Sequence, residues 1–144
     1  MPMTVTRPET ESVAGFDVSL GRDGKQGEPL TDGDRLWPAL MRRVVRAHMS
    51  LWGLGALAGT AELLMSELVT NALEHGHGTV GVRVWRTETQ LCAEVLSAGP
   101  RTARVREAGP YDESGRGLQL VAALADGWGV SADGVWCALA IGGT

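Results

Sequence analysis

The feature that most constrains the fold of this chain is a change of hydrophobic period at Gly76 and Gly78. Before these glycines, apolar residues recur at helical spacing from about Thr60, a suitable N-cap residue, to His75. After them, the valines between 80 and 84 alternate with other residues, as they would in a half-buried strand. Because glycine commonly follows the last residue of a helix, we expect a long helix to lead directly into a strand here.

An earlier amphipathic helix is expected from Asp34 to about Trp52. Pro38 falls in its first turn, where a missing backbone N–H is tolerated, and Gly53 follows its last turn. Apolar residues that recur every three or four positions predict one stripe facing the core, made of Leu36, Leu40, Val44, Ala47 and Leu51.

Period-two alternation indicates further strands. We expect an edge strand over Phe16–Leu20 and a strand over Leu91–Val95 that forms a hairpin with the valine strand. Two final strands flank Ala132–Gly134, and Val130 is expected to open the first of them.

The segment from Ala98 to Ser114 has little apolar pattern and is long for a passive connection, so a functional loop is expected there. A third helix follows from Gly117 to Ala125, and Gly127 and Gly129 are expected to end it. The order of elements predicts an α+β fold with helices on one face of a mostly antiparallel sheet. We expect a flexible N-terminal segment over residues 1–15 and one domain over residues 16–144.

Composition narrows the class of function only slightly. The formal net charge of −4 and the calculated pI of about 5.3 argue against a surface built to bind nucleic-acid phosphates. No run approaches the roughly 20 apolar residues of a membrane span, and the first residues lack an apolar signal region. A cytoplasmic protein is therefore expected. Cys92 and Cys137 lie in strand-like runs without metal or redox spacing, so we interpret them as buried thiols.

Glu67, Asn71 and His75 are spaced four residues apart in the helix before Gly76, so their side chains share one helix face. A carboxylate and a carboxamide on one face supply hard oxygen ligands for a hydrated magnesium ion, and the carboxylate can also orient a nucleophile. A solvated helix face with a polar cap would have the same pattern. Spacing alone leaves both interpretations open.

A second candidate site is the run SGRG at Ser114–Gly117, between the long loop and the third helix. Free N–H groups and the helix dipole at such a junction favour a phosphate group. A flexible hinge would look the same in sequence, so this interpretation also stays open.

Two motifs resemble those of the histidine-kinase-like ATPases, the GHKL superfamily with the Bergerat fold. The run ELLMSELVTNALEHG resembles the N box of this superfamily, and the run SGRGLQLVAALADGWGV resembles its G2 box. The resemblance covers about Phe16 to Ile141 and is closest to the bacterial anti-sigma-factor serine/threonine kinases and their actinomycete relatives, which are ATP-binding regulatory proteins. It implies a two-layer α/β sandwich whose helices cover one face of a mixed, mostly antiparallel sheet.

The resemblance also implies roles for individual residues. Asn71 would coordinate the Mg²⁺ that bridges the ATP phosphates, and Glu67 would be the catalytic residue that activates the attacking hydroxyl or water. The segment from about Pro100 to Ser114 would be the ATP lid. The other nucleotide-binding positions that it implies are His75, Ser97, Gly99, Gly115, Arg116, Gly117 and Leu118.

Two positions depart from the family's pattern. Ser97 stands where the G1 box has an aspartate that accepts a hydrogen bond from the adenine amino group, although Gly99 keeps the glycine two places later. Loss of a charged acceptor costs roughly 1.5 to 3 kcal/mol, or about ten- to hundredfold in affinity. Glu74 stands where nucleotide-binding members can have a basic residue.

Three functions remain as alternatives. Intact Glu67 and Asn71 favour a protein-serine kinase that phosphorylates an antagonist protein and, as a homodimer, binds a sigma factor in transcription regulation. Ser97 and Glu74 favour a degenerate, non-catalytic binding module with weak or no ATP binding. Three arginines of the lid region, Arg101, Arg104 and Arg106, leave a nucleic-acid-binding regulator as the least favoured alternative. Neither nucleic acid nor a membrane is the expected partner.

Overall fold

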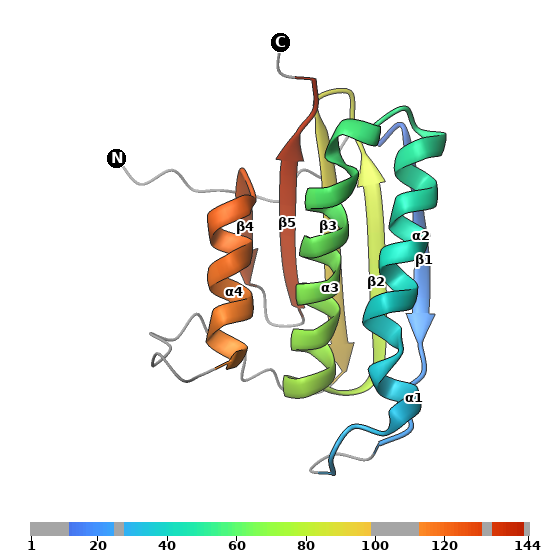
Figure 1. Cartoon of the computed structure of the whole chain (residues 1–144), viewed down its shortest axis with the longest axis vertical. Coiled ribbons are helices and arrows are strands. Elements are labelled where there is room, and N and C mark those ends of the chain that lie inside the picture. Colours follow the sequence, from blue (N-terminus) through green and yellow to red (C-terminus); the bar gives the residue numbers. More distant parts are fainter. Residues whose placement is uncertain (1–11, 25–27, 99–112, 131–133, 143–144) are drawn as a thin grey trace.

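The structure is a computed structural model that describes residues 12–24, 28–98, 113–130 and 134–142 (Figure 1). Its elements, in chain order, are β1 Ala14–Leu20, α1 Asp32–Arg35, α2 Trp37–Leu51, the 3₁₀ turn η1 Gly55–Leu57, α3 Ala58–His75, β2 His77–Arg86, β3 Gln90–Ala98, α4 Glu113–Leu124, β4 Gly127–Val130 and β5 Gly134–Ala140.

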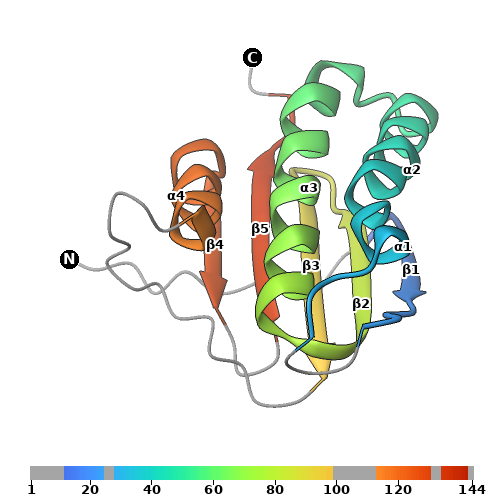
Figure 2. The ribbon, with the colours of Figure 1, turned by 60° about the horizontal axis from the view of Figure 1, so that its bottom comes forward.

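The five strands form one sheet in the order β1-β2-β3-β5-β4, and the four pairings between these described strands are antiparallel. The helices α2, α3 and α4 lie side by side on one face of this sheet, as Figures 1 and 2 show. The predicted α+β architecture, with its helices on one face, is therefore confirmed. β1 is an edge strand, as the alternation of Phe16–Leu20 predicted.

The core lies between the helices and the sheet. Side chains that alternate along the strands face it, which confirms the prediction for the valines of β2. The most deeply buried side chains are Val45, Met49, Leu64, Met65, Leu68, Val69, Leu73, Val80, Val82, Val84, Val95 and Val121.

The predicted core stripe of the earlier helix is wrong except at Val44, which is partly buried against the core. That helix is interrupted at Leu36, so that the short α1 precedes α2, and Pro38 lies in the first turn of α2. Leu36, Leu40 and Leu51 have exposed fractions of 60%, 42% and 77%. The buried residues of α2 are instead Met41, Val45 and Met49. Both sets recur at helical spacing, so the period of the sequence does not tell which of the two stripes faces the sheet.

Two predicted helix starts also move. α3 begins at Ala58, because η1 leads directly into it, so Thr60 lies inside the helix and is not its N-cap. α4 begins at Glu113, which places Gly115 and Gly117 inside the helix.

α4 ends at Leu124, and the predicted stop residues Gly127 and Gly129 lie in β4. Val130 is the last residue of this strand and not its first. A Cβ atom at Gly129 would lie 2.6 Å from Nε1 of Trp136 on the paired strand β5. This glycine therefore makes room for an indole ring, a requirement that sequence does not distinguish from a helix stop.

A second, smaller apolar cluster consists of Trp85, Cys92, Trp136 and Ala138. Cys92 and Cys137 are both buried free cysteines, as predicted. Burial raises the pKa of the Cys92 thiol to about 11 and that of Cys137 to about 12. Among the described residues, no helix has the length and apolar character needed to cross a membrane.

Candidate functional site

Helix α3 places the two principal candidate residues on the edge of its buried face. Asn71 follows Leu68 by three positions, so helical spacing brings its carboxamide onto the apolar stripe, where only 5% of the residue is exposed. Glu67, one turn earlier, is half-buried. Asn71 therefore does not belong to a solvated helix face, which was the alternative interpretation of the sequence, because its side chain is buried.

The Asn71 amide has an unmet hydrogen-bonding requirement. Its Nδ2 atom is buried and has no hydrogen-bond partner within the part of the chain that the structure describes. Leaving a buried donor without an acceptor costs about 1–3 kcal/mol, so an orphaned amide of this kind calls for an explanation. The ring nitrogen Nε2 of His75, one turn further along α3, is in the same condition.

Ser97 lies at the end of β3, opposite Val80 of β2, and is 5% exposed. It packs against Gly76, the residue that ends α3: a Cβ atom at Gly76 would lie 2.2 Å from Ser97 Oγ. The sequence therefore brings Ser97 to the same end of α3 as Asn71 and His75.

Glu74 is exposed, although it follows Asn71 by only three positions. Its carboxylate therefore does not belong to the buried face that carries the orphaned amide. The repulsion between this acid and a polyphosphate, which the sequence suggested, is accordingly weakened by solvent.

Helix α4 runs beside α3 (Figure 1), and its first residues carry the predicted phosphate-binding positions Gly115, Arg116 and Gly117. Leu118, the next residue, is buried in the core, with an exposed fraction of 5%. Gly99 and most of the predicted lid, residues 100–112, lie outside the described residues, as do its three arginines.

Arg22 contacts the end of α3 and was not indicated by the sequence. It lies in the loop after β1, is half-buried, and donates a hydrogen bond from Nη1 to the carbonyl oxygen of Gly76, 54 positions away. Its Nε atom is buried and, among the described residues, has no acceptor. Only the folded structure brings this side chain to the end of α3, so no local pattern could have identified it.

No group of three or more His, Cys, Asp or Glu side chains that could hold a metal ion occurs in the described ranges. The Asn71 carboxamide oxygen would be a suitable ligand for a magnesium ion at this site. Mg²⁺ is commonly held by few protein ligands, with water and substrate phosphates completing its octahedron.

A helical layer on one face of an antiparallel sheet, with Glu67 and Asn71 on its central helix, defines a domain of the GHKL class. The sequence model of the Histidine kinase-like ATPase domain family matches residues 37–139, and the chain belongs to this family. Its domain is thus of the ATP-binding regulatory type. No curated protein matches the chain. β1, α1 and the loop that carries Arg22 precede the matched residues.

Proposed function

We propose that this protein binds Mg²⁺-ATP and acts as a regulatory protein-serine/threonine kinase of the anti-sigma-factor type. The observation that carries the proposal is the buried Asn71 carboxamide, which shares a helix face with Glu67 and whose Nδ2 has no partner among the described residues. A fold that buries an amide without satisfying it gains stability when a ligand supplies the missing partner.

The residues of this site fit the proposed cofactor. The oxygen of the Asn71 carboxamide is a hard ligand for Mg²⁺, and its nitrogen remains free to donate to an oxygen of the nucleotide. ATP, when bound with its metal, supplies the transferable phosphoryl group. The first residues of α4 would contribute backbone N–H groups to the phosphates.

Glu67 is the proposed general base. Its half-buried carboxylate lies one turn from Asn71, so it can accept at one of its oxygens the proton of a serine or threonine hydroxyl that approaches the metal-bound nucleotide. In such a reaction the protein contributes mainly positioning and charge neutralisation. The proposed acceptor is an antagonist protein, and a sigma factor is the proposed second partner of a homodimer.

Isothermal titration calorimetry with Mg²⁺-ATP tests the binding step. Asn71→Ala is expected to weaken binding about tenfold or more, because it removes the metal ligand. Thr70→Ala, the neighbouring position on α3, is the matched control and should bind as the wild type does. Equal affinities of Asn71→Ala and wild type would overturn the proposed role of Asn71.

A second function is favoured by one observation. Ser97 is buried against Gly76 and offers a hydroxyl where the family's adenine-binding carboxylate is expected. A binding module that keeps its partner surfaces but has lost useful ATP affinity would carry such a change. A dissociation constant for Mg²⁺-ATP well above millimolar in the wild type would select this second function.

A further inference from the structure

The loop after β1 is anchored on both sides of Arg22. The indole nitrogen Nε1 of Trp37 donates to the carbonyl oxygen of Gly21 at 2.9 Å. The backbone N–H groups of Asp23 and Gly24 donate to the two carboxylate oxygens of Asp34 at 2.8 and 3.0 Å. We name residues 21–24 the anchored loop. Hydrogen bonds to Asp34 of α1 and Trp37 of α2 therefore fix the position of this loop.

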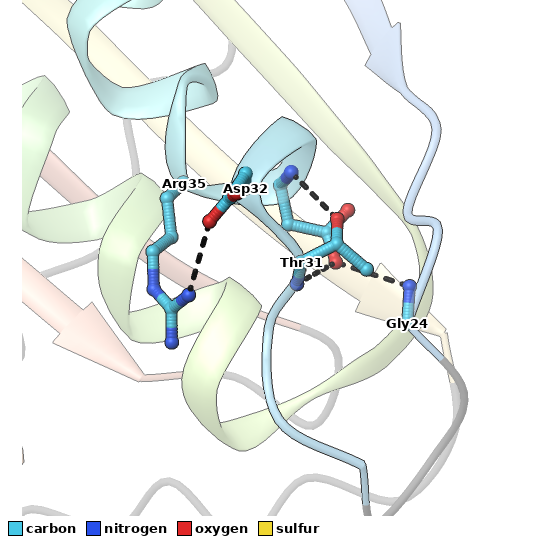
Figure 3. A network of polar contacts seen from close by, with 5 residues as sticks. Gly24, Thr31, Asp32 and Arg35 are labelled. Carbon is cyan, nitrogen blue, oxygen red and sulfur yellow. Dashed lines mark hydrogen bonds and ion pairs between the residues drawn. The ribbon is translucent and has the colours of Figure 1, made fainter.

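The carboxylate of Asp34 accepts the hydrogen bonds that hold this loop. Its side chain is completely buried, and Oδ2 also accepts the N–H of Thr31 at 3.2 Å, while Thr31 Oγ1 accepts the N–H of Asp34 at 3.0 Å (Figure 3). Burial by itself raises the pKa of Asp34, but the hydrogen bonds from Asp23, Thr31 and Gly24 outweigh it and hold the pKa below its ordinary value. The carboxylate is therefore ionised at neutral pH, and charge-assisted hydrogen bonds are the stronger kind.

Between these anchors, the Arg22 side chain reaches the end of α3. One guanidinium nitrogen, Nη1, donates a hydrogen bond to the Gly76 carbonyl oxygen, and the buried Nε has no acceptor within the described part of the chain. The side-chain nitrogens Asn71 Nδ2 and His75 Nε2, which have no partner among the described residues, lie at the end of the same helix, whose residues 71 to 75 span about 6 Å along the axis. In the part of the chain that the structure describes, three buried nitrogens without a partner thus belong to the end of α3 and to the anchored loop that contacts it.

The chemistry of this gathering favours an anion. Arginine keeps its charge at every accessible pH and offers donors only, and an amide nitrogen is likewise a donor. The missing partners of Arg22 Nε and Asn71 Nδ2 are therefore acceptors, whereas His75 Nε2 can donate or accept, depending on its tautomer. α3 itself carries Glu62, Glu67 and Glu74 but no lysine or arginine, so a cation for a polyphosphate has to come from another element.

We infer that Arg22 is an anion-binding residue of this site, and that the anchored loop presents its guanidinium to the phosphate oxygens of Mg²⁺-ATP. The inference rests on the proposed function and extends it with a residue that lies before the part of the chain matched by the family. Arg22 supplies the positive charge that position 74, an exposed glutamate, does not. Planar guanidinium donors suit phosphate oxygens because they can form two parallel hydrogen bonds.

A purely structural role for Arg22 makes a different prediction. An arginine that only donates a hydrogen bond to the Gly76 carbonyl oxygen would stabilise the end of α3. Its loss would lower the stability of the fold and would weaken the binding of charged and uncharged ligands alike. A phosphate contact, in contrast, affects ligands in proportion to the phosphates that they carry. Comparison of ATP, adenosine and inorganic tripolyphosphate separates the two roles.

The experiment is calorimetric titration of the full chain with Mg²⁺-ATP, Mg²⁺-tripolyphosphate and adenosine. Arg22→Met is expected to weaken ATP and tripolyphosphate binding about ten- to hundredfold and to leave adenosine binding unchanged. Arg22→Lys keeps the charge and should recover part of the loss. The matched control is Arg35→Met, because Arg35 is an exposed arginine of α1 whose ion pair with Asp32 is long, at 3.8 Å. It should bind all three ligands as the wild type does.

The titration results distinguish a failure of the inference about Arg22 from a failure of the proposed function. If wild type binds ATP and Arg22→Met binds it equally well, or loses ATP and adenosine affinity alike, the inference about Arg22 is overturned while the proposed function stands. If wild type binds no ATP but binds tripolyphosphate through Arg22, the proposed function fails and the anion site stands. Thermal unfolding of each variant identifies a loss that comes from unfolding alone, and such a result also counts against the phosphate contact.

Discussion

Gly76 lies so close to Ser97 that a Cβ atom at position 76 would be 2.2 Å from the serine Oγ and 2.5 Å from its Cβ. The glycine that ends α3 is therefore also the residue that allows β3 to approach the helix. Through this contact and the hydrogen bond from Arg22 to the Gly76 carbonyl oxygen, the end of β3, the end of α3 and the anchored loop meet at Gly76.

Gly76→Ala should lower the free energy of unfolding by about 1–3 kcal/mol, because the added methyl group overlaps Ser97 and lies 2.9 Å from the Ala72 carbonyl oxygen. Urea denaturation measures the difference. Gly59→Ala is the matched control: this glycine lies in the same helix with nothing within 4 Å of its Cβ position, so alanine there should raise stability by about 0.5–1 kcal/mol. An unchanged Gly76→Ala would contradict the close packing.

The parts of the fold that sequence predicted well are those where one local pattern has one solution. The alternating valines of β2 face the core, since a strand with one buried face can place them in no other register. α2 has two stripes of the same period, and only its packing on α3 and the sheet decides that Met41, Val45 and Met49 are buried.

The candidate site shows the same division. Glu67 and Asn71 could be found from their spacing on one helix and from the resemblance of their motif. Arg22 could not, because its contact with Gly76 joins positions 54 residues apart, and the anchored loop that carries it is held by hydrogen bonds to Asp34. Long-range polar contacts of this kind leave no periodic signal in the sequence.

The contribution of Asp34 to stability should depend on pH in one direction. Its folded-state pKa lies below the ordinary value of 3.8, so the ionised carboxylate stabilises the fold above about pH 4. This stabilisation is lost as the pH falls through the lower, folded-state pKa. The difference in unfolding free energy between wild type and Asp34→Asn should therefore be largest near neutral pH and shrink progressively below pH 4.

Asp32→Asn serves as the control for this pH series. Asp32 belongs to the same short helix, but its side chain is fully exposed and its only ion pair in the described residues is with Arg35 (Figure 3). Exposed pairs contribute little, so the unfolding free energy of Asp32→Asn should follow that of the wild type at every pH. A constant Asp34→Asn difference from pH 7 to pH 2 would contradict the role of the ionised carboxylate.

Glu67→Gln should separate catalysis from binding. The substitution keeps the size of the side chain but removes its ability to accept a proton, so the rate of ADP formation from Mg²⁺-ATP should fall about 10²- to 10⁴-fold while the ATP dissociation constant stays the same. Glu74→Gln changes the same type of side chain on the same helix at an exposed position and should leave the rate unaltered. Equal rates for the two variants would remove Glu67 from the reaction.

Ser97→Asp should supply the carboxylate that the resemblance implies for binding adenine and that this chain replaces with a serine. We expect it to tighten ATP and adenosine binding about ten- to hundredfold, because a charged acceptor replaces a hydroxyl. Tripolyphosphate binding should not improve, since the added negative charge offers nothing to a phosphate. Ser19→Asp, an exposed position on β1, controls for the change of net charge. Because Gly76 crowds Ser97 Oγ, the new carboxylate has to point away from α3; unchanged adenosine affinity in a stably folded variant would show that position 97 does not face the base.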